Sequence, residues 1–153
     1  MKKLLSLLLI PIVFLSSCAS ASSKALKNLS LPFNYKLSFG GVPFFAEITP
    51  EKAVLTLENV AFSLVFEGDK IKAYCGEYER EVCETDFKVP CLLVKSLREI
   101  KNKPSSASKG LLTFALDESE LLVYYNEDSG DLTRLTIKRK GKEFTLDVIS
   151  ALE

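Results

Sequence analysis

The chain has 153 residues, enough for one ordinary domain with its own hydrophobic core. Lys and Arg together number 20, and Asp and Glu also number 20, so no basic excess exists to contact a phosphate backbone. We therefore expect no nucleic acid among the partners. The chain has no histidine, which removes the commonest catalytic base and the commonest metal ligand. We expect no enzymatic activity, no catalytic residues, no metal site and no cofactor.

The first seventeen residues have the three zones of a secretory signal peptide. Lys2 and Lys3 give a positive start, the stretch from Leu4 to Leu15 is mostly apolar, and Ser16 and Ser17 are small. The apolar run is shorter than the ~20 residues that a membrane-spanning helix needs. We expect residues 1–17 to be a cleaved signal peptide, with an uncleaved N-terminal anchor as the alternative.

The signal peptide ends at a sequence, Leu15-Ser16-Ser17-Cys18, that resembles the bacterial lipobox. The resemblance implies cleavage after Ser17 and a diacylglycerol thioether on Cys18. The protein would then be exported across the cytoplasmic membrane and anchored by lipid to the cell membrane or the outer membrane, on the extracytoplasmic side. The alternative is a plain secretory signal with an incidental cysteine.

Residues 18–30 are rich in Ser, Ala and Lys and show no alternating pattern. We expect them to form the lipid anchor and a short tether, whose eleven or so residues reach at most ~40 Å. A single β-rich domain is expected over residues 31–153.

The first half of this domain alternates apolar and polar residues with the two-residue period of half-buried strands. Gly40-Gly41 and Gly68-Asp69 are hairpin signals between such runs. The pattern predicts an antiparallel meander of five strands and a weakly marked sixth, in the ranges Leu31–Phe39, Val42–Ile48, Ala53–Leu57, Val60–Phe66, Ile71–Cys75 and Tyr78–Val82.

An amphipathic helix is expected from Pro90 to Asn102, followed by a flexible loop over residues 105–110. Pro90 suits a first helical turn, and Leu93, Leu97 and Ile100 share one face. Alternation then returns in four further strands, Leu112–Leu116, Leu121–Tyr125, Leu135–Ile137 and Phe144–Val148. The polar segment from Asn126 to Asp131 loosely suggests a calcium loop, but its glycine lies one position early and a hairpin turn explains it better.

These elements predict a mainly β (α+β) fold, a curved antiparallel sheet of about 8–9 strands partly wrapped around one amphipathic helix. The aromatic strand pair, the turn from Phe66 to Ile71, the central helix and the segment from Tyr125 to Ile137 together resemble small LolA/LolB-like lipoproteins. That resemblance implies a half-open sheet with a helical lid over a cavity for acyl chains. No ligand-contacting residue of that family is matched to a position here.

Several strands carry apolar residues on both faces, as in Phe44-Phe45, Leu64-Val65 and Leu121-Leu122. The second face either packs against the helix or lines a pocket for an apolar ligand. The residues expected around such a pocket are Phe44, Phe62, Leu64, Phe66, Leu93, Leu97, Ile100 and Phe114.

Three cysteines remain in the expected domain, Cys75, Cys83 and Cys91. They allow one disulfide with a free thiol, or they are small buried apolar residues. Their spacing of eight residues is unlike the close pairs of zinc sites.

The sequence thus favours a membrane-anchored, non-enzymatic binding module for an apolar ligand or a lipidated partner. Its expected partners are the membrane, through the lipid on Cys18, and a lipid or an envelope protein. The alternative function is a structural or protein-interaction lipoprotein of the cell envelope.

Overall fold

The computed structural model describes residues 21–101 and 103–153. The expected signal peptide and lipidation site, residues 1–17 and Cys18, lie outside the described residues, as does the expected helix end at residue 102. Within the described part of the chain, no helix is long and apolar enough to cross a membrane.

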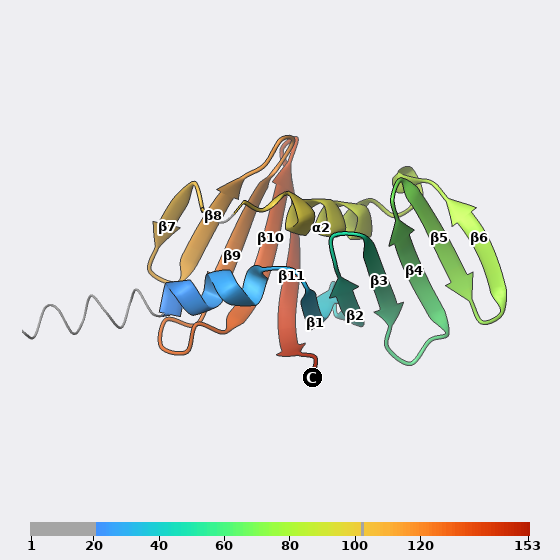
Figure 1. Ribbon diagram of the computed structural model, residues 1–153, viewed down its shortest axis with the longest axis horizontal. Helices are drawn as coiled ribbons and strands as arrows, with labels where there is room; N and C mark the ends of the chain where they lie inside the picture. Colours follow the sequence, from blue (N-terminus) through green and yellow to red (C-terminus); the bar gives the residue numbers. More distant parts are fainter. Residues whose placement is uncertain (1–20, 102) are drawn as a thin grey trace, which may run out of the picture.

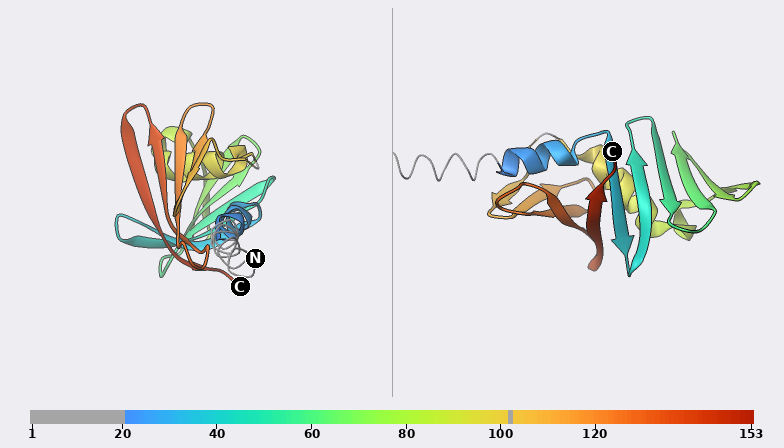
Figure 2. Two further views of the ribbon diagram at one scale, coloured as in Figure 1. Left: turned by 90° about the vertical axis from the view of Figure 1, so that its left-hand side faces the viewer. Right: turned by 90° about the horizontal axis from the view of Figure 1, so that it is seen from below.

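The described residues form one open, curved antiparallel sheet of eleven strands with two helices on its concave face (Figures 1 and 2). The strand order is β6-β5-β4-β3-β2-β1-β11-β10-β9-β8-β7, so the first strand pairs with the last at the centre. The strands are β1 (Phe33–Phe39), β2 (Val42–Ile48), β3 (Lys52–Leu57), β4 (Phe62–Glu67), β5 (Lys70–Cys75), β6 (Tyr78–Val82), β7 (Ser106–Ser108), β8 (Leu111–Ala115), β9 (Glu120–Tyr125), β10 (Leu132–Arg139) and β11 (Lys142–Ala151).

The two-residue alternation of the sequence turns one face of this sheet into the core. In the register across β1 to β4, Phe33 lies opposite Ile48, which lies opposite Ala53, and this residue lies opposite Phe66. All four side chains are buried, because residues that lie opposite one another on neighbouring strands point to the same face of the sheet. The expected mainly β, antiparallel and curved architecture is confirmed.

The helix α2 (Lys88–Glu99) covers part of that face (Figure 1). Pro90 stands in its first turn, as expected, and Leu93 and Leu97 are buried. The helix begins two residues before the predicted start and ends at Glu99, since Ile100 already has extended backbone. A short 3₁₀ turn, η1 (Glu84–Asp86), precedes it. Near its end, Arg98 Nε donates a hydrogen bond to the carbonyl oxygen of Thr49 at 3.1 Å and so ties α2 to the β2–β3 turn.

The predicted number of strands was too low, because two edge strands show no apolar alternation. The weakly marked strand β6 is nearly all exposed, with Val82 its one half-buried residue. The three residues of β7 fall in the segment expected to be a flexible loop, and all are exposed. A strand that buries neither face needs no alternation of apolar and polar side chains, so it carries no two-residue period to detect.

The expected tether is wrong for residues 21–29, which form a helix packed on the sheet. Ala21, Ala25 and Leu29 recur every four residues, lie on one face and are buried in the same core as α2. Lys24 Nζ lies 3.0 Å from Asp131 Oδ1, and Asn28 Nδ2 donates to the Gly130 carbonyl oxygen at 3.3 Å. The folded domain therefore begins by residue 21 and not at residue 31.

Candidate functional site

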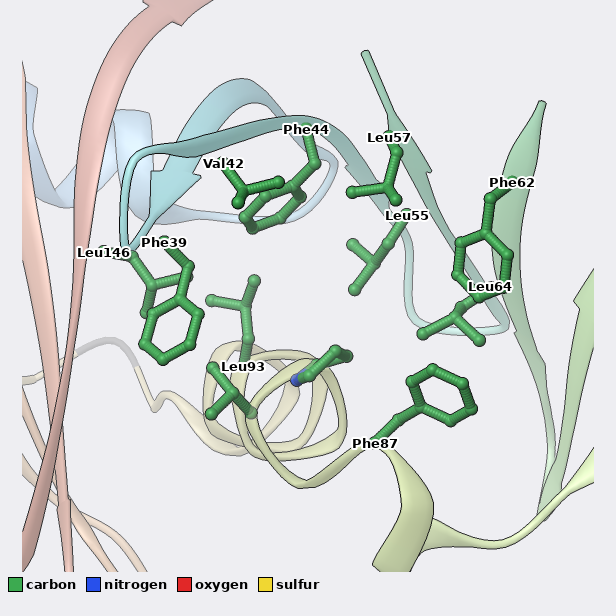
Figure 3. Close-up of a pocket in the computed structure, with 12 residues that line it drawn as sticks. Phe39, Val42, Phe44, Leu55, Leu57, Phe62, Leu64, Phe87, Leu93 and Leu146 are labelled. Atoms are coloured by element: carbon green, nitrogen blue, oxygen red, sulfur yellow. The ribbon is translucent and has the colours of Figure 1, made fainter. Parts of the chain in front are cut away.

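An apolar cavity of about 290 Å³ lies between the inner face of the sheet and the first turns of α2 (Figure 3). The labelled side chains of β1 to β4 and of β11 surround an open space, with Phe87 and Leu93 on its opposite side. The lining residues are Phe39, Val42, Phe44, Leu55, Leu57, Phe62, Leu64, Phe87, Val89, Pro90, Leu93 and Leu146.

The sheet register explains why the strands contribute these residues. Leu37 lies opposite Phe44, which lies opposite Leu57, and Phe39 lies opposite Val42, so all these side chains occupy the inner face. Under the middle of α2 that face is filled by the buried helix residues. At the β1–β2 hairpin end the strands extend past the start of the helix, because one helix covers only part of a wide sheet. The uncovered part of the apolar face forms the cavity.

The cavity has a buried floor and an open mouth. Leu93 and Leu146 at the floor are 0% exposed and Leu64 is 3% exposed, whereas Phe39 and Val42 are 39% and 53% exposed. Large apolar side chains at such exposure beside a cavity lose contact with water when a ligand covers them, which is the usual driving force for apolar binding.

The chemistry of this site is limited to apolar contact. None of the lining residues has an ionisable or hydrogen-bonding side chain. Among the described residues, no group of three or more potential metal ligands comes together. The arrangement can therefore hold an apolar group, and it offers no side chain for proton transfer, nucleophilic attack or metal binding.

The structure brings half of the expected pocket residues together. Phe44, Phe62, Leu64 and Leu93 line the cavity. Leu97 is 1% exposed and belongs to the packed core. The other three lie elsewhere: Phe66 borders a separate hollow beside Cys91, and Ile100 and Phe114 border another at the far end of α2.

Eight lining residues escaped the sequence prediction: Phe39, Val42, Leu55, Leu57, Phe87, Val89, Pro90 and Leu146. The alternation places Phe39, Val42 and Leu57 on the same face as Phe44, so their membership could have been read from the register. Phe87 and Val89 carry no comparable signal, because their role depends on where α2 begins relative to the strands.

All three cysteines of the described domain are unpaired. Cys75 ends β5, while Cys83 follows Val82, which lies opposite Ile71. The two thiols thus stand at opposite ends of the β5–β6 hairpin, about five residues or ~17 Å apart, whereas a disulfide needs Cα atoms within ~7 Å. Cys91 is buried, and burial, helped by the nearby Glu84 carboxylate, raises the pKa of its thiol to about 11. This thiol stays protonated at neutral pH and is a poor nucleophile.

No protein-family model matches the chain, and no curated protein matches it. Its structure is similar to that of the hypothetical protein CT021 from Chlamydia trachomatis, with a TM-score of 0.40 and 13% identity over 87% of this chain and 94% of that one. It is also similar to the LolA superfamily protein NE2245 from Nitrosomonas europaea, with a TM-score of 0.33 and 7% identity over 90% of this chain and 94% of that one. The second belongs to the superfamily that the sequence pattern resembles. At TM-scores below 0.5, neither similarity carries an argument about function.

Proposed function

We propose that this chain is a non-enzymatic binding protein that holds an apolar ligand, such as one acyl chain, between its sheet and α2. The observation that supports the proposal is the lining of the cavity, which is apolar throughout and open at one end. Ligand pockets are mostly apolar and have volumes of about 300–1,000 Å³. A cavity of about 290 Å³ lies just below this range, and its small volume suits one acyl chain better than several.

We also propose that the protein acts next to a membrane, attached through a lipid on Cys18 and exposed on the extracytoplasmic side. The lipobox-like segment from Leu15 to Cys18 and the signal-like residues before it support this proposal. The nearly balanced charge of the domain gives it little attraction of its own for anionic lipid, so a covalent anchor would supply the attachment.

A protein-binding role is the second candidate, and the outer edge of β6 favours it. This strand pairs with β5 on one side and ends the sheet on the other. Its first residue, Tyr78, is 83% exposed, and Val60 in the β3–β4 turn is 57% exposed. A free strand edge with exposed apolar side chains can add a strand from a partner.

Tryptophan fluorescence tests the binding proposal directly, because the chain has no tryptophan. Phe44 lines the cavity, whereas the neighbouring Phe45 points to the opposite face of β2. We expect a fatty acid brominated along its chain to quench the fluorescence of the Phe44→Trp variant, saturably and at low concentration. The Phe45→Trp variant is the matched control and should be quenched only weakly.

Equal quenching of both variants, or none of Phe44→Trp up to the concentration at which the fatty acid aggregates, would contradict the proposal. Cross-linking of one protein partner through β6, with no quenching in the cavity, would favour the second candidate.

A further inference from the structure

A second cavity, of about 370 Å³, lies beside the first turns of α2 and differs from the apolar cavity in its charge. Its basic residues come from the start of α2 and from the β10–β11 hairpin, two segments far apart in the sequence. The lining residues are Glu84, Thr85, Lys88, Leu92, Arg139, Lys140, Lys142 and Phe144.

Four cationic side chains and one carboxylate therefore border this cavity. The chain as a whole has equal numbers of acidic and basic residues, so the excess is local. Its acid, Glu84, has a side chain that is 61% exposed and reaches Arg139 Nη1 only at 4.0 Å. Within the described residues, Lys88, Lys140 and Lys142 form no salt bridge. Lys140 interacts electrostatically with Glu118, so Lys88 and Lys142 are the two ammonium groups left to attract an anion into the hollow.

Arg139 adds a guanidinium group to this set. Its Nη2 donates to Glu118 Oε2 outside the cavity, and Coulombic attraction from Lys95 and then from Arg139 lowers the pKa of Glu118. Its Nε is buried and has no hydrogen-bond partner in the described part of the chain. A buried donor without an acceptor costs free energy, and the exposed part of the same guanidinium group borders the cavity as a fixed positive charge.

The basic cavity and the apolar cavity share the same two elements. On α2, Lys88 and Leu92 are four residues apart on one face and line the basic cavity, whereas Val89 and Leu93 on the adjoining face line the apolar one. On β11, Phe144 and Leu146 are alternate residues of one face, ~7 Å apart, and each lines one of the two cavities. The apolar side chains of Leu92 and Phe144 are part of the lining of the basic cavity.

We infer that the ligand of this protein is a single-chain anionic amphiphile, an inference that rests on the proposed function. The hydrocarbon chain lies in the apolar cavity, and a phosphate or carboxylate headgroup lies in the basic cavity between Lys88 and the β10–β11 hairpin. Both kinds of headgroup accept the charge-assisted hydrogen bonds that ammonium and guanidinium groups donate.

The test compares three amphiphiles that share one alkyl chain and differ in charge: dodecyl phosphate, dodecyl maltoside and dodecyltrimethylammonium. Affinities for the full chain are measured by titration calorimetry below the concentrations at which micelles form, with inorganic phosphate as a separate probe. We expect dodecyl phosphate to bind about tenfold more tightly than the uncharged dodecyl maltoside, and dodecyltrimethylammonium to bind most weakly. The preference for the anion should fall as salt is raised, since salt screens exposed charges.

The Lys88→Gln/Lys142→Gln double variant should lose this preference and retain its affinity for dodecyl maltoside. Both side chains are exposed, so the protein is expected to stay folded. The Lys27→Gln/Lys70→Gln double variant removes the same charge at exposed sites outside both cavities and should keep the preference.

The outcomes separate this inference from the function on which it rests. Equal affinities for dodecyl phosphate and dodecyl maltoside overturn the inference and leave the apolar site intact. Binding of none of the three amphiphiles overturns the proposed function as well. Inorganic phosphate binding as tightly as dodecyl phosphate would mean a site for a free anion, and it too overturns the inference. A preference that persists in Lys88→Gln/Lys142→Gln also overturns it.

Discussion

Substitution of Gly130 by alanine should release the helix of residues 21–29 from the sheet. Gly130 has a φ of +72°, and a Cβ atom added there would lie 2.6 Å from the Ala21 carbonyl oxygen and 2.8 Å from Lys24 Cβ. The left-handed backbone alone costs an L-residue about 1–2 kcal/mol. The close contact forces the helix outward, which exposes Leu29, and burial of one such side chain is worth about 1.5–3 kcal/mol. We therefore expect a loss of about 2.5–5 kcal/mol in the free energy of unfolding.

The matched control is Gly141→Ala. Gly141 stands in the β10–β11 hairpin with a φ of +73°, and a Cβ atom there would meet nothing within 4 Å. This variant should lose only the backbone contribution of about 1–2 kcal/mol. Urea unfolding measures both free energies, and amide hydrogen exchange reports residues 21–29 directly. The reasoning is refuted if the two variants are equally destabilised and residues 21–29 exchange as slowly in Gly130→Ala as in the unsubstituted protein.

Three further predictions concern the same core and the thiols. Leu29→Ala should lower the free energy of unfolding by about 2–5 kcal/mol in urea, since this side chain is 1% exposed. The pKa of Asp131 is lowered, chiefly by its hydrogen bond from Lys24. The Asp131 carboxylate therefore contributes its full stabilisation above its unfolded pKa of about 3.9, and this contribution is lost as pH falls through the lower folded pKa. The urea midpoint, measured as a function of pH, should fall over this acidic range, and the fall should be smaller in Asp131→Asn. In the Cys18→Ser variant, whose remaining cysteines are Cys75, Cys83 and Cys91, a maleimide at neutral pH should modify the exposed Cys75 and Cys83 in minutes and spare Cys91. The labels are counted by intact mass, and rapid triple labelling of this variant would contradict the buried, protonated thiol.

The sequence predicted the elements that have apolar side chains on a buried face and polar side chains on an exposed face. Alternation located β1 to β5 and β8 to β11, because each of these strands packs one face on the core, β5 through the half-buried Ile71 and Ala73. It missed β7 and marked β6 only weakly, since both faces of those edge strands meet water. The N-terminal helix was missed for a different reason. Its buried face is made of Ala21, Ala25 and Leu29. Alanine is only slightly more hydrophobic than the serines around it, so the two alanines do not stand out as an apolar face in the sequence.

Half of the expected pocket residues line the candidate site, because periodicity predicts which face a side chain occupies but not its position along the sheet. The strand period assigns Phe44, Phe62 and Leu64 to the inner face, and the helical period assigns Leu93 to the face of α2 that meets it. Neither period says where along the sheet the helix lies. Leu97 and Ile100 share the helical face of Leu93, yet they lie toward the other end of α2, where the face is packed or borders a different hollow. The position of α2 is set by tertiary contacts such as that between Arg98 and Thr49, which no local pattern encodes.

The docked N-terminal helix changes what an anchor at Cys18 would mean for the bound ligand. A free tether of eleven or so residues would let the domain range over ~40 Å, but with residues 21–29 packed on the sheet the segment from Cys18 to residue 21 spans at most ~10 Å. A lipid on Cys18, as proposed, would therefore be attached close to the β9–β10 turn, to which the helix is bound. The basic cavity lies at the other end of β10, whose eight residues rise ~25 Å from Leu132 to Arg139. An amphiphile in the two cavities would then be bound at the end of the sheet opposite to the proposed attachment point.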